Sequence, residues 1–370
     1  MDLFTAYFMT DSPQRYYGFD LLRGFALICG IVIHAPLVLR IDDIVGDTAN
    51  VQIPLIIDLI SGWIHQWRMP VFFLMAGFFA HMIMLKKSVL AFVKDRLIRL
   101  FPALVVFCGF YAFIWDSEFG TLFHLWFLYY LLIISIFSSF FQYASQAFKT
   151  DYVDKYLAYF ANKKFGLFLY LIPLTLLTYW GRSDGLEGKI PKHFFEIEMK
   201  PLIYYWSWFL LGEIMFTRRY LIDFTKKFRI IILLSLIAIS SQVTLWLLFE
   251  HSEVRGLRIN FLSALATFSW TFLLIGLFSK LISIPKPLLK FVVKVSYSVY
   301  LVHLAPAIFF GAILFEIGLP PTTIFLVNIV VTSVSSLLIY FFLVKFTPLD
   351  WLISGYQKSW FQPFPVKLRR

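Results

Sequence analysis

Charged residues and cysteines are both scarce in this chain. Only 15% of its 370 residues are Asp, Glu, Lys or Arg, and its two cysteines are Cys29 and Cys108. Soluble domains carry about 25% charged residues, so the low charge excludes an ordinary soluble domain. The cysteines lie in separate apolar runs, which excludes a disulfide framework and the paired spacing of a zinc site. We also find no internal repeat, no low-complexity tract and no pattern of a removable signal peptide.

Apolar residues are correspondingly abundant in the sequence. Hydrophobic residues make up 60% of the chain and aromatic residues 20%, and the mean hydropathy is +0.77. One membrane crossing needs about 20 apolar residues in a helix. The sequence therefore predicts an all-α, polytopic membrane helix bundle, a single domain over residues 1–370 with about ten transmembrane helices. Their expected ranges are 18–39, 55–84, 97–116, 123–147, 165–180, 201–217, 229–249, 259–279, 295–316 and 323–346.

The distribution of Lys and Arg predicts the orientation of these helices. With ten helices and an inner N-terminus, 24 of the 33 Lys and Arg residues lie in cytoplasmic segments and seven in outer ones. Positive residues favour the cytoplasmic side, so we expect both termini in the cytoplasm. The net charge of +11 is then a topology signal that also attracts anionic lipids, and it requires no nucleic-acid partner.

Three ionisable residues occur in the first expected helix, FDLLRGFALICGIVIHA: Asp20, Arg23 and His34. Charged groups at membrane depth are costly and usually mark a functional interior surface. Arg23 and His34 are eleven positions apart, which leaves them about 20° apart around the helix and about 16 Å apart along it. Asp20 can pair with Arg23 one turn away. The alternative is a structural ion pair beside a packed histidine.

The second helix contains WIHQWRMPVFFLMAGFF, which places His65 and Arg68 on one face. We expect Arg68 near the middle of the membrane, facing the protein interior, with Pro70 and Gly77 as flexible points of the backbone. The alternative for Arg68 is a structural bridge to backbone carbonyls.

Two further segments carry candidate residues near the membrane surfaces. KDRLIRLFPAL puts Arg96 and Arg99 at the end of an inner loop, on the face where the third helix enters the membrane. Such a pair suits phosphate groups, although positive-inside flanking explains it equally well. HLWFLYYLL puts His124 and Trp126 at the outer start of the fourth helix, where a Trp is also an ordinary interfacial anchor.

The ninth helix contains VSYSVYLVHLAP, with Tyr297, Tyr300 and His303 at intervals of three and Pro306 loosening the helix beyond them. A polar contact between helices is the plain alternative. Together the candidates form an expected path across the membrane. From inside to outside the order is Arg96 and Arg99, then Arg23 and His303, then Arg68, then His34, His65 and His124.

In order and spacing, these motifs resemble the integral-membrane acyltransferase-3 superfamily across nearly the whole chain. The resemblance rests on Arg23 and His34 with ten residues between them, RMPVFFLMAGFF, KDRLIRLFP, HLWFLYYLL and YSVYLVHLAP. Among its branches, the chain is most similar to the glucan-modifying succinyltransferase group. It departs from the family at Ala76, where serine is frequent, so a hydroxyl donor is missing there.

The resemblance implies a multi-pass enzyme of the bacterial inner membrane that transfers an acyl group from cytosolic acyl-CoA to a carbohydrate hydroxyl outside. The donor is succinyl-CoA or acetyl-CoA, the acceptor is an extracytoplasmic glucan or another polysaccharide, and no bound cofactor or metal is required. His34 corresponds to the family's catalytic histidine and Arg23 to its arginine. A homo-oligomer is compatible with this reading.

The remaining roles follow from the expected depths. A neutral His34 would act as general base or form a transient acyl-histidine, and Asp20 would orient Arg23. Arg96 and Arg99 would hold the CoA phosphates. The groups expected to bind the acyl group, the acceptor or the developing oxyanion are Arg68, His65, His124, Trp126, Tyr300 and His303. A succinyl carboxylate would first meet Arg68.

Two other classes of protein remain as alternatives. A transporter or flippase for acylated sugar or lipid would use a polar path without acyl-transfer chemistry, but no pair of similarly interrupted helices marks the two halves of the chain. A structural or receptor-like membrane protein leaves the spacing of Arg23 and His34 unexplained.

Overall fold

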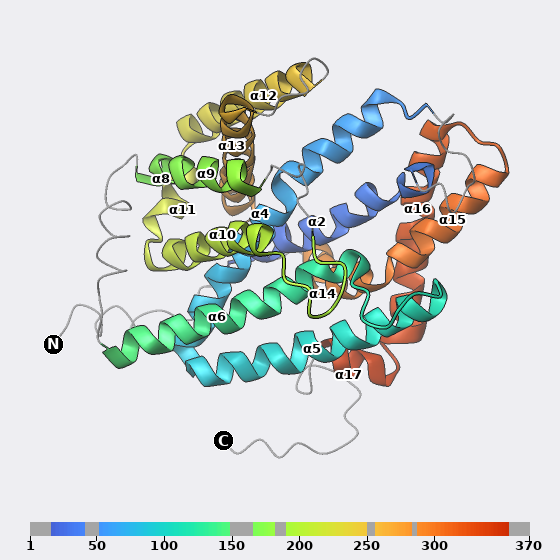
Figure 1. Cartoon of the computed structure of the whole chain (residues 1–370), viewed down its shortest axis with the longest axis horizontal. Helices are drawn as coiled ribbons and strands as arrows, with labels where there is room; N and C mark the ends of the chain where they lie inside the picture. The colour runs from blue at the N-terminus through green and yellow to red at the C-terminus, as the bar shows by residue number, and fades with distance from the viewer. Residues whose placement is uncertain are drawn as a thin grey trace.

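A computed structural model describes residues 16–40, 52–148, 166–181, 190–249, 256–282 and 287–354. Within these ranges the chain is helical and has no β-strand, only an isolated bridge between Thr121 and His193. The all-α prediction is confirmed. The helices, drawn in Figure 1, are α2 (Tyr17–His34), η1 (Leu37–Arg40), α4 (Leu55–Lys87), α5 (Val89–Ile114), η3 (Phe123–Leu125), α6 (Trp126–Phe148), α8 (Gly166–Leu169), α9 (Leu171–Gly181), α10 (Met199–Thr217), α11 (Tyr220–Thr225), α12 (Phe228–Phe249), α13 (Leu257–Leu281), α14 (Pro287–Val302), α15 (Leu304–Glu316), α16 (Pro321–Ile339), η5 (Tyr340–Val344) and α17 (Pro348–Ser354).

Seven of these helices are long and apolar enough to cross a membrane, and the bent pair of α14 and α15 makes up to eight. The other two expected crossings correspond to α8 and α9, which together form a shorter apolar segment, and to α10. The multi-pass bundle therefore agrees with the sequence, while the count of ten and the cytoplasmic termini stay predictions.

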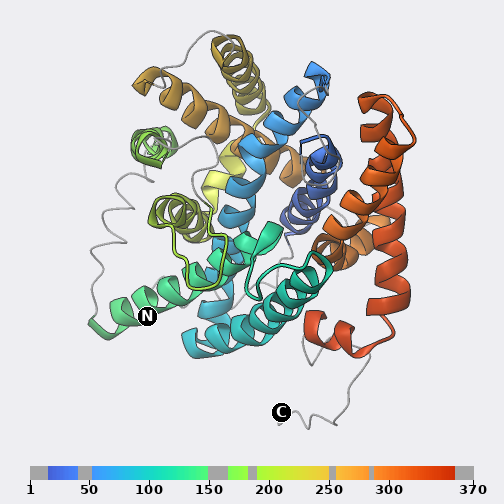
Figure 2. The same cartoon turned by 45° about the vertical axis from the view of Figure 1, so that its right-hand side comes forward.

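Helices α2 and α4 run through the middle of the bundle (Figure 1). Helices α5 and α6 lie on one side of them and α12 and α13 on another, while α14, α15 and α16 form a third group (Figure 2). Helix α2 packs against α4, α13 and α14, which brings the first and last quarters of the chain together. This arrangement places the end of α2 beside the junction of α14 and α15.

The tightest packing joins α4 to α10 through two glycines. A Cβ added to Gly77 would lie 1.9 Å from the carbonyl oxygen of Phe209, and one added to Gly212 would lie 1.8 Å from that of Leu74. Only glycine permits such close backbones, as is common between membrane helices. Helix α4 is helical through both Pro70 and Gly77. The expectation that Gly77 is a flexible point is therefore wrong, because it is a packing contact.

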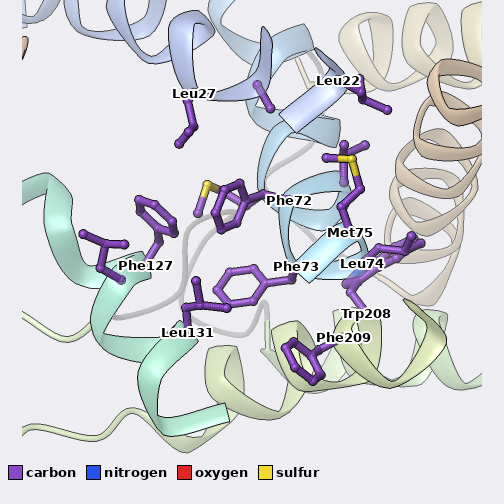
Figure 3. Close-up of a cluster of buried hydrophobic side chains, with 14 of the residues drawn as sticks. Leu22, Leu27, Phe72, Phe73, Leu74, Met75, Phe127, Leu131, Trp208 and Phe209 are labelled. Carbon is purple, nitrogen blue, oxygen red and sulfur yellow. The ribbon is translucent and has the colours of Figure 1, made fainter. Parts of the chain in front are cut away.

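Large apolar side chains fill the space around this contact. Figure 3 shows Phe72, Phe73, Leu74 and Met75 of α4 pointing into a cluster with side chains of three neighbouring helices. The partners labelled there are Leu22 and Leu27 of α2, Phe127 and Leu131 of α6, and Trp208 and Phe209 of α10. Because α4 supplies side chains in several directions, it fixes the positions of α2 and α6 relative to each other.

Helix α5 begins earlier than the sequence suggested. The inner loop was expected to continue to Arg96, but only Ser88 separates α4 from α5. Its side chain accepts a hydrogen bond of 3.3 Å from the backbone N–H of Ala91, the contact of an N-cap. Arg96 and Arg99 therefore lie inside a helix rather than at the end of a loop.

The expected ninth helix is broken at His303 into α14 and α15, which meet at an angle of 65°. Proline has no backbone N–H, so Pro306 cannot donate to the carbonyl of Val302, the last residue of α14. The sequence placed the loosening beyond His303, and the structure places it at His303 itself.

Candidate active site

Three histidines that are far apart in the sequence meet at the broken helix. His34 is the last residue of α2, His124 lies in η3 just before α6, and His303 occupies the break between α14 and α15. The ring centroids of His34 and His303 are 5.2 Å apart, those of His124 and His303 are 5.1 Å apart, and those of His34 and His124 are 6.0 Å apart. The three imidazoles therefore form one cluster, called here the histidine cluster.

The carbonyl of Tyr300 holds two of these rings in place. His124 donates through Nε2 over 3.1 Å and His303 donates through Nδ1 over 2.6 Å, both to this oxygen. The hydroxyl of Tyr300 in turn donates to the carbonyl of His124. Since the break beyond Tyr300 leaves helix carbonyls near the bend without regular partners, side chains can satisfy them. The break thus supplies the acceptor that orients the cluster.

Tyr111 of α5 supports the same bend, and the sequence analysis missed it. Its hydroxyl donates to the carbonyl of Leu301 over 2.8 Å, and its ring lies edge-on to His124 at 5.1 Å. Phe123, the residue before His124, has a φ of +46°, in the left-handed region. Nothing in the apolar run around Tyr111 distinguishes it from the neighbouring aromatic residues, so only the fold reveals this contact.

The bonds to Tyr300 also fix where the ring protons lie. A carbonyl oxygen only accepts, so a neutral His124 carries its proton on Nε2 and a neutral His303 carries it on Nδ1. Nδ1 of His124 and Nε2 of His303 are then hydrogen-bond acceptors. Both are buried and have no hydrogen-bond partner among the residues that the structure describes, and the same holds for Nδ1 of His34. His34 is half-buried, whereas the other two side chains are buried. Among the described residues, no group of three His, Cys, Asp or Glu is arranged to hold a metal ion.

Arg68 brings a positive charge to the histidine cluster. Its side chain is buried, and its Nε donates to the carbonyl of Ala26 over 2.8 Å. A Cβ added to Gly30, one turn before His34, would lie 2.7 Å from Nη2 of Arg68 and 3.2 Å from Nε2 of His303. Gly30 is therefore the surface of α2 on which the guanidinium and the imidazole both rest. The sequence analysis missed Gly30, since a glycine in a helix carries no chemical signal by itself.

His65 and Trp126 lie farther from the centre. His65 is exposed on α4, where it interacts electrostatically with His34. The ring of Trp126 contacts those of Tyr130, at 5.9 Å, and Tyr205, at 5.5 Å between centroids. Tyr205 also interacts electrostatically with Arg68, so Trp126 reaches the site only through a neighbour.

The predicted basic residues gather at the other end of α2. Arg23 pairs with Asp20 at 3.6 Å, which confirms the expected ion pair, and Arg99 pairs with Asp95 at 2.9 Å. The charges of Arg23 and Arg99 both act on Arg96, whose guanidinium lies 4.9 Å from the ring centroid of Phe92. We call Arg23, Arg96 and Arg99 the arginine cluster. Asp95 was not singled out in the sequence, although it follows the ordinary i, i+4 spacing.

Tyr297 interacts electrostatically with Arg96. One placement in the expected path requires correction. His303 was expected in the inner half, apart from His34, yet their rings are in contact. The reason is the earlier start of α14 at Pro287, sixteen residues before His303, which places this histidine about 24 Å along the helix instead of about 12 Å.

Comparison with known proteins gives one match, to the family model Acyl_transf_3, described as an acyltransferase domain, over residues 16–344. No curated protein and no solved structure matches the chain. The matched range begins just before α2 and ends with η5, so it contains both clusters. The chain therefore belongs to the acyltransferase-3 family of acyltransferase domains.

Proposed function

We propose that this protein is a membrane-bound O-acyltransferase of the bacterial inner membrane. It transfers a succinyl or acetyl group from cytosolic acyl-CoA to a hydroxyl of an extracytoplasmic glucan or other polysaccharide. The observation that carries the proposal is the histidine cluster, in which the half-buried His34 meets two oriented histidines and a buried arginine. Membership in an acyltransferase family supports the reaction type.

His34 is the proposed general base. A nitrogen of its imidazole takes the proton of the sugar hydroxyl as the hydroxyl oxygen attacks the thioester carbon. A C–O bond forms, the C–S bond breaks, and the electron pair of that bond leaves with the CoA sulfur. The protonated His34 then returns its proton to the thiolate, so the products are the sugar ester and CoA.

Arg68 supplies positive charge where negative charge develops. Its guanidinium and His303 both rest on Gly30, one turn from His34. A buried cation in that position stabilises the tetrahedral oxyanion, and with a succinyl donor it also offers a partner to the free carboxylate. An acetyl group needs no such partner, so the identity of the donor tests this part of the proposal.

The acceptor nitrogens of the cluster favour a polyhydroxylated acceptor. The carbonyl of Tyr300 accepts a hydrogen bond from one ring nitrogen of His124 and one of His303, and the other nitrogen of each ring has no hydrogen-bond partner among the described residues. A buried hydrogen-bond acceptor without a donor is costly, and a sugar carries several neighbouring hydroxyls that can donate to both nitrogens. A carbohydrate therefore satisfies the cluster better than an alcohol with a single hydroxyl.

The arginine cluster is the proposed site for the phosphates of acyl-CoA. Arg23 and His34 lie on one helix about 16 Å apart, so a donor held by its phosphates at one end can place its acyl group near the other. Arg99 forms an ion pair with Asp95, whereas Nε of Arg96 is buried and has no hydrogen-bond partner within the described part of the chain. Arg96 is therefore the readier phosphate ligand.

The test is CoA release by purified protein given succinyl-CoA or acetyl-CoA, with and without an extracytoplasmic glucan. We expect glucan-dependent release with one of the donors, and a loss of at least 100-fold in kcat in His34→Ala, within the range of about 10²–10⁴ for general base catalysis. Mass spectrometry of the glucan identifies the ester. The donor that supports release identifies the acyl group.

His81→Ala is the matched control, because His81 is also half-buried in a long helix, where its ring packs 5.6 Å from that of Phe216. It should retain activity. Glucan movement across proteoliposomes without CoA release would instead indicate a transporter. Full activity of His34→Ala would contradict the assignment of the base.

A further inference from the structure

Asn328 of α16 joins the two helix ends that carry His34 and His303. Its side chain is fully buried, and its Nδ2 donates to the carbonyl of Ala35 over 2.8 Å and to that of Ala307 over 2.9 Å. Ala35 directly follows His34. The backbone N–H of Ala307 donates to the carbonyl of His303. One amide group thus contacts the backbone one residue after His34 and one helical turn after His303.

The carbonyl of Ala35 is available because α2 ends there. In a continuing α-helix it would accept from the N–H of Leu39, but that N–H donates to Pro36 over 3.0 Å. An unsatisfied carbonyl inside a membrane protein is costly, and a second helix can supply the missing donor. Asn328 supplies it, and its own Oδ1 accepts from the hydroxyl of Thr332 over 3.0 Å.

The surroundings of Asn328 leave it little freedom. A Cβ added to Gly311 of α15 would lie 2.9 Å from Nδ2 of Asn328 and 3.0 Å from Cγ1 of Val38. The glycine therefore makes room for the amide between α15 and η1. With both hydrogens of Nδ2 and its Oδ1 engaged, the orientation of the amide is fixed.

From this geometry we propose that Asn328 is a positioning residue, which holds His34 and His303 at the separation that acyl transfer requires. The proposal rests on the proposed function, in which His34 is the base. Displacements of about 1 Å in a catalytic group can lower the rate about 100-fold. Loss of the hydrogen bonds from Asn328 to the two helix ends should therefore lower kcat. Asn328 itself touches neither substrate nor the reacting atoms.

The test compares Asn328→Ala, which removes the donor, with Asn328→Asp, which places an oxygen against two carbonyls. Both should lower kcat at least about tenfold while KM for acyl-CoA changes less than about threefold, because the arginine cluster lies at the other end of α2. A merely structural loss would instead lower the amount of folded protein and leave the kcat of that fraction unchanged. The amount of folded protein is therefore measured by size-exclusion chromatography, the stability of each variant by its Tm, and kcat is calculated per folded molecule.

Tyr170→Phe is the control, since it removes another side-chain hydrogen bond between distant segments. This is the half-buried 2.8 Å bond from Tyr170, in the turn between α8 and α9, to Ser207 of α10. The substitution should lower Tm without lowering kcat. Wild-type kcat in both Asn328 variants, or a kcat loss in Tyr170→Phe of the same size at the same fall in Tm, would overturn the positioning role. If His34→Ala also keeps the wild-type kcat, the proposed function is wrong. If the Asn328 variants keep it and His34→Ala does not, only the positioning role of Asn328 is wrong.

Discussion

Backbone atoms orient two of the three imidazoles of the histidine cluster and the guanidinium beside them. The carbonyl of Tyr300 determines which nitrogen of His124 and of His303 carries the proton. Ala26 anchors Arg68 through its carbonyl, and Gly30 provides the space beside it. The chemistry of the site therefore depends on backbone atoms, which a sequence motif does not reveal.

Gly30→Ala tests this dependence at a single atom. The added methyl group would meet the far end of the Arg68 side chain at 2.7 Å, so the guanidinium can move and the fold should survive. Alanine is favoured over glycine in a helix by about 0.8–1.0 kcal/mol, which offsets part of the strain. We expect Tm within a few degrees of wild type and a kcat lowered about tenfold or more, measured by CoA release.

The control for that substitution is Gly24→Ala in the same helix. Its Cβ would lie 3.4 Å from Oγ of Ser296, an ordinary contact, so activity should be retained. Equal kcat values in the Gly30 and Gly24 variants would show that the position of Arg68 does not limit the reaction.

Among the helices, the bent pair of α14 and α15 decides the geometry of the site. Its angle of 65° turns His303 toward α2 and leaves the carbonyls of Tyr300 and Leu301 to accept from side chains. Proline inside a helix removes a backbone hydrogen bond and its ring clashes with the carbonyl four residues earlier. The bend is thus encoded by Pro306, but its consequence appears only when α2 and α6 pack against it.

Pro306→Ala should restore the missing N–H to Val302 and straighten this element. Because the alanine removes the ring that opposes the carbonyl of Val302, we expect Tm to stay equal or rise. The kcat should nevertheless fall about tenfold or more, since His303 would leave the cluster. Both are measured on the same detergent-purified sample.

Pro102→Ala provides the comparison, because Pro102 lies within α5, which continues as one helix through it. This variant should keep its kcat at saturating acyl-CoA. An unchanged kcat in Pro306→Ala, together with a raised Tm, would indicate that the bend has no catalytic role.

On the scale of the whole molecule, α2 separates two clusters of different charge character. Arg23, Arg96 and Arg99 lie toward its beginning, and the three histidines lie at its end. Binding of the donor and the chemical step can therefore be altered independently. In the proposed function, the arginine cluster binds the donor and the histidine cluster binds the acceptor.

Arg96→Gln should change binding without changing chemistry. Hydrogen bonds to charged groups contribute about 1.5–3 kcal/mol, which corresponds to a rise of about tenfold or more in KM for acyl-CoA. The kcat at saturation should stay within about threefold of wild type. Steady-state kinetics of CoA release over a range of donor concentrations measures both constants.

Arg219→Gln serves as the control, since Arg219 also lies over a ring, 4.9 Å from the centroid of Phe216, as Arg96 does over Phe92. It should leave KM unchanged. A lower kcat with unchanged KM in Arg96→Gln would place Arg96 in the chemical step instead of the phosphate site.

The sequence by itself determined the membrane class, the helical fold and most of the candidate residues. Long apolar runs leave few alternatives to helices, and ionisable residues within them are costly enough to stand out. The ion pair of Asp20 and Arg23 follows from spacing on one helix, so it was predictable. These are local properties, which depend on residues within a few turns of each other.

Only the tertiary structure decided which candidates meet and what orients them. His34 and His303 are 269 positions apart, and their contact depends on where α14 begins and how far it bends. Sequence spacing gives no direct measure of packing between distant helices. Tyr111, Gly30 and Asn328 could not be distinguished beforehand, because their roles arise from backbone carbonyls and free space that exist only after α2, α5, α15 and α16 have packed.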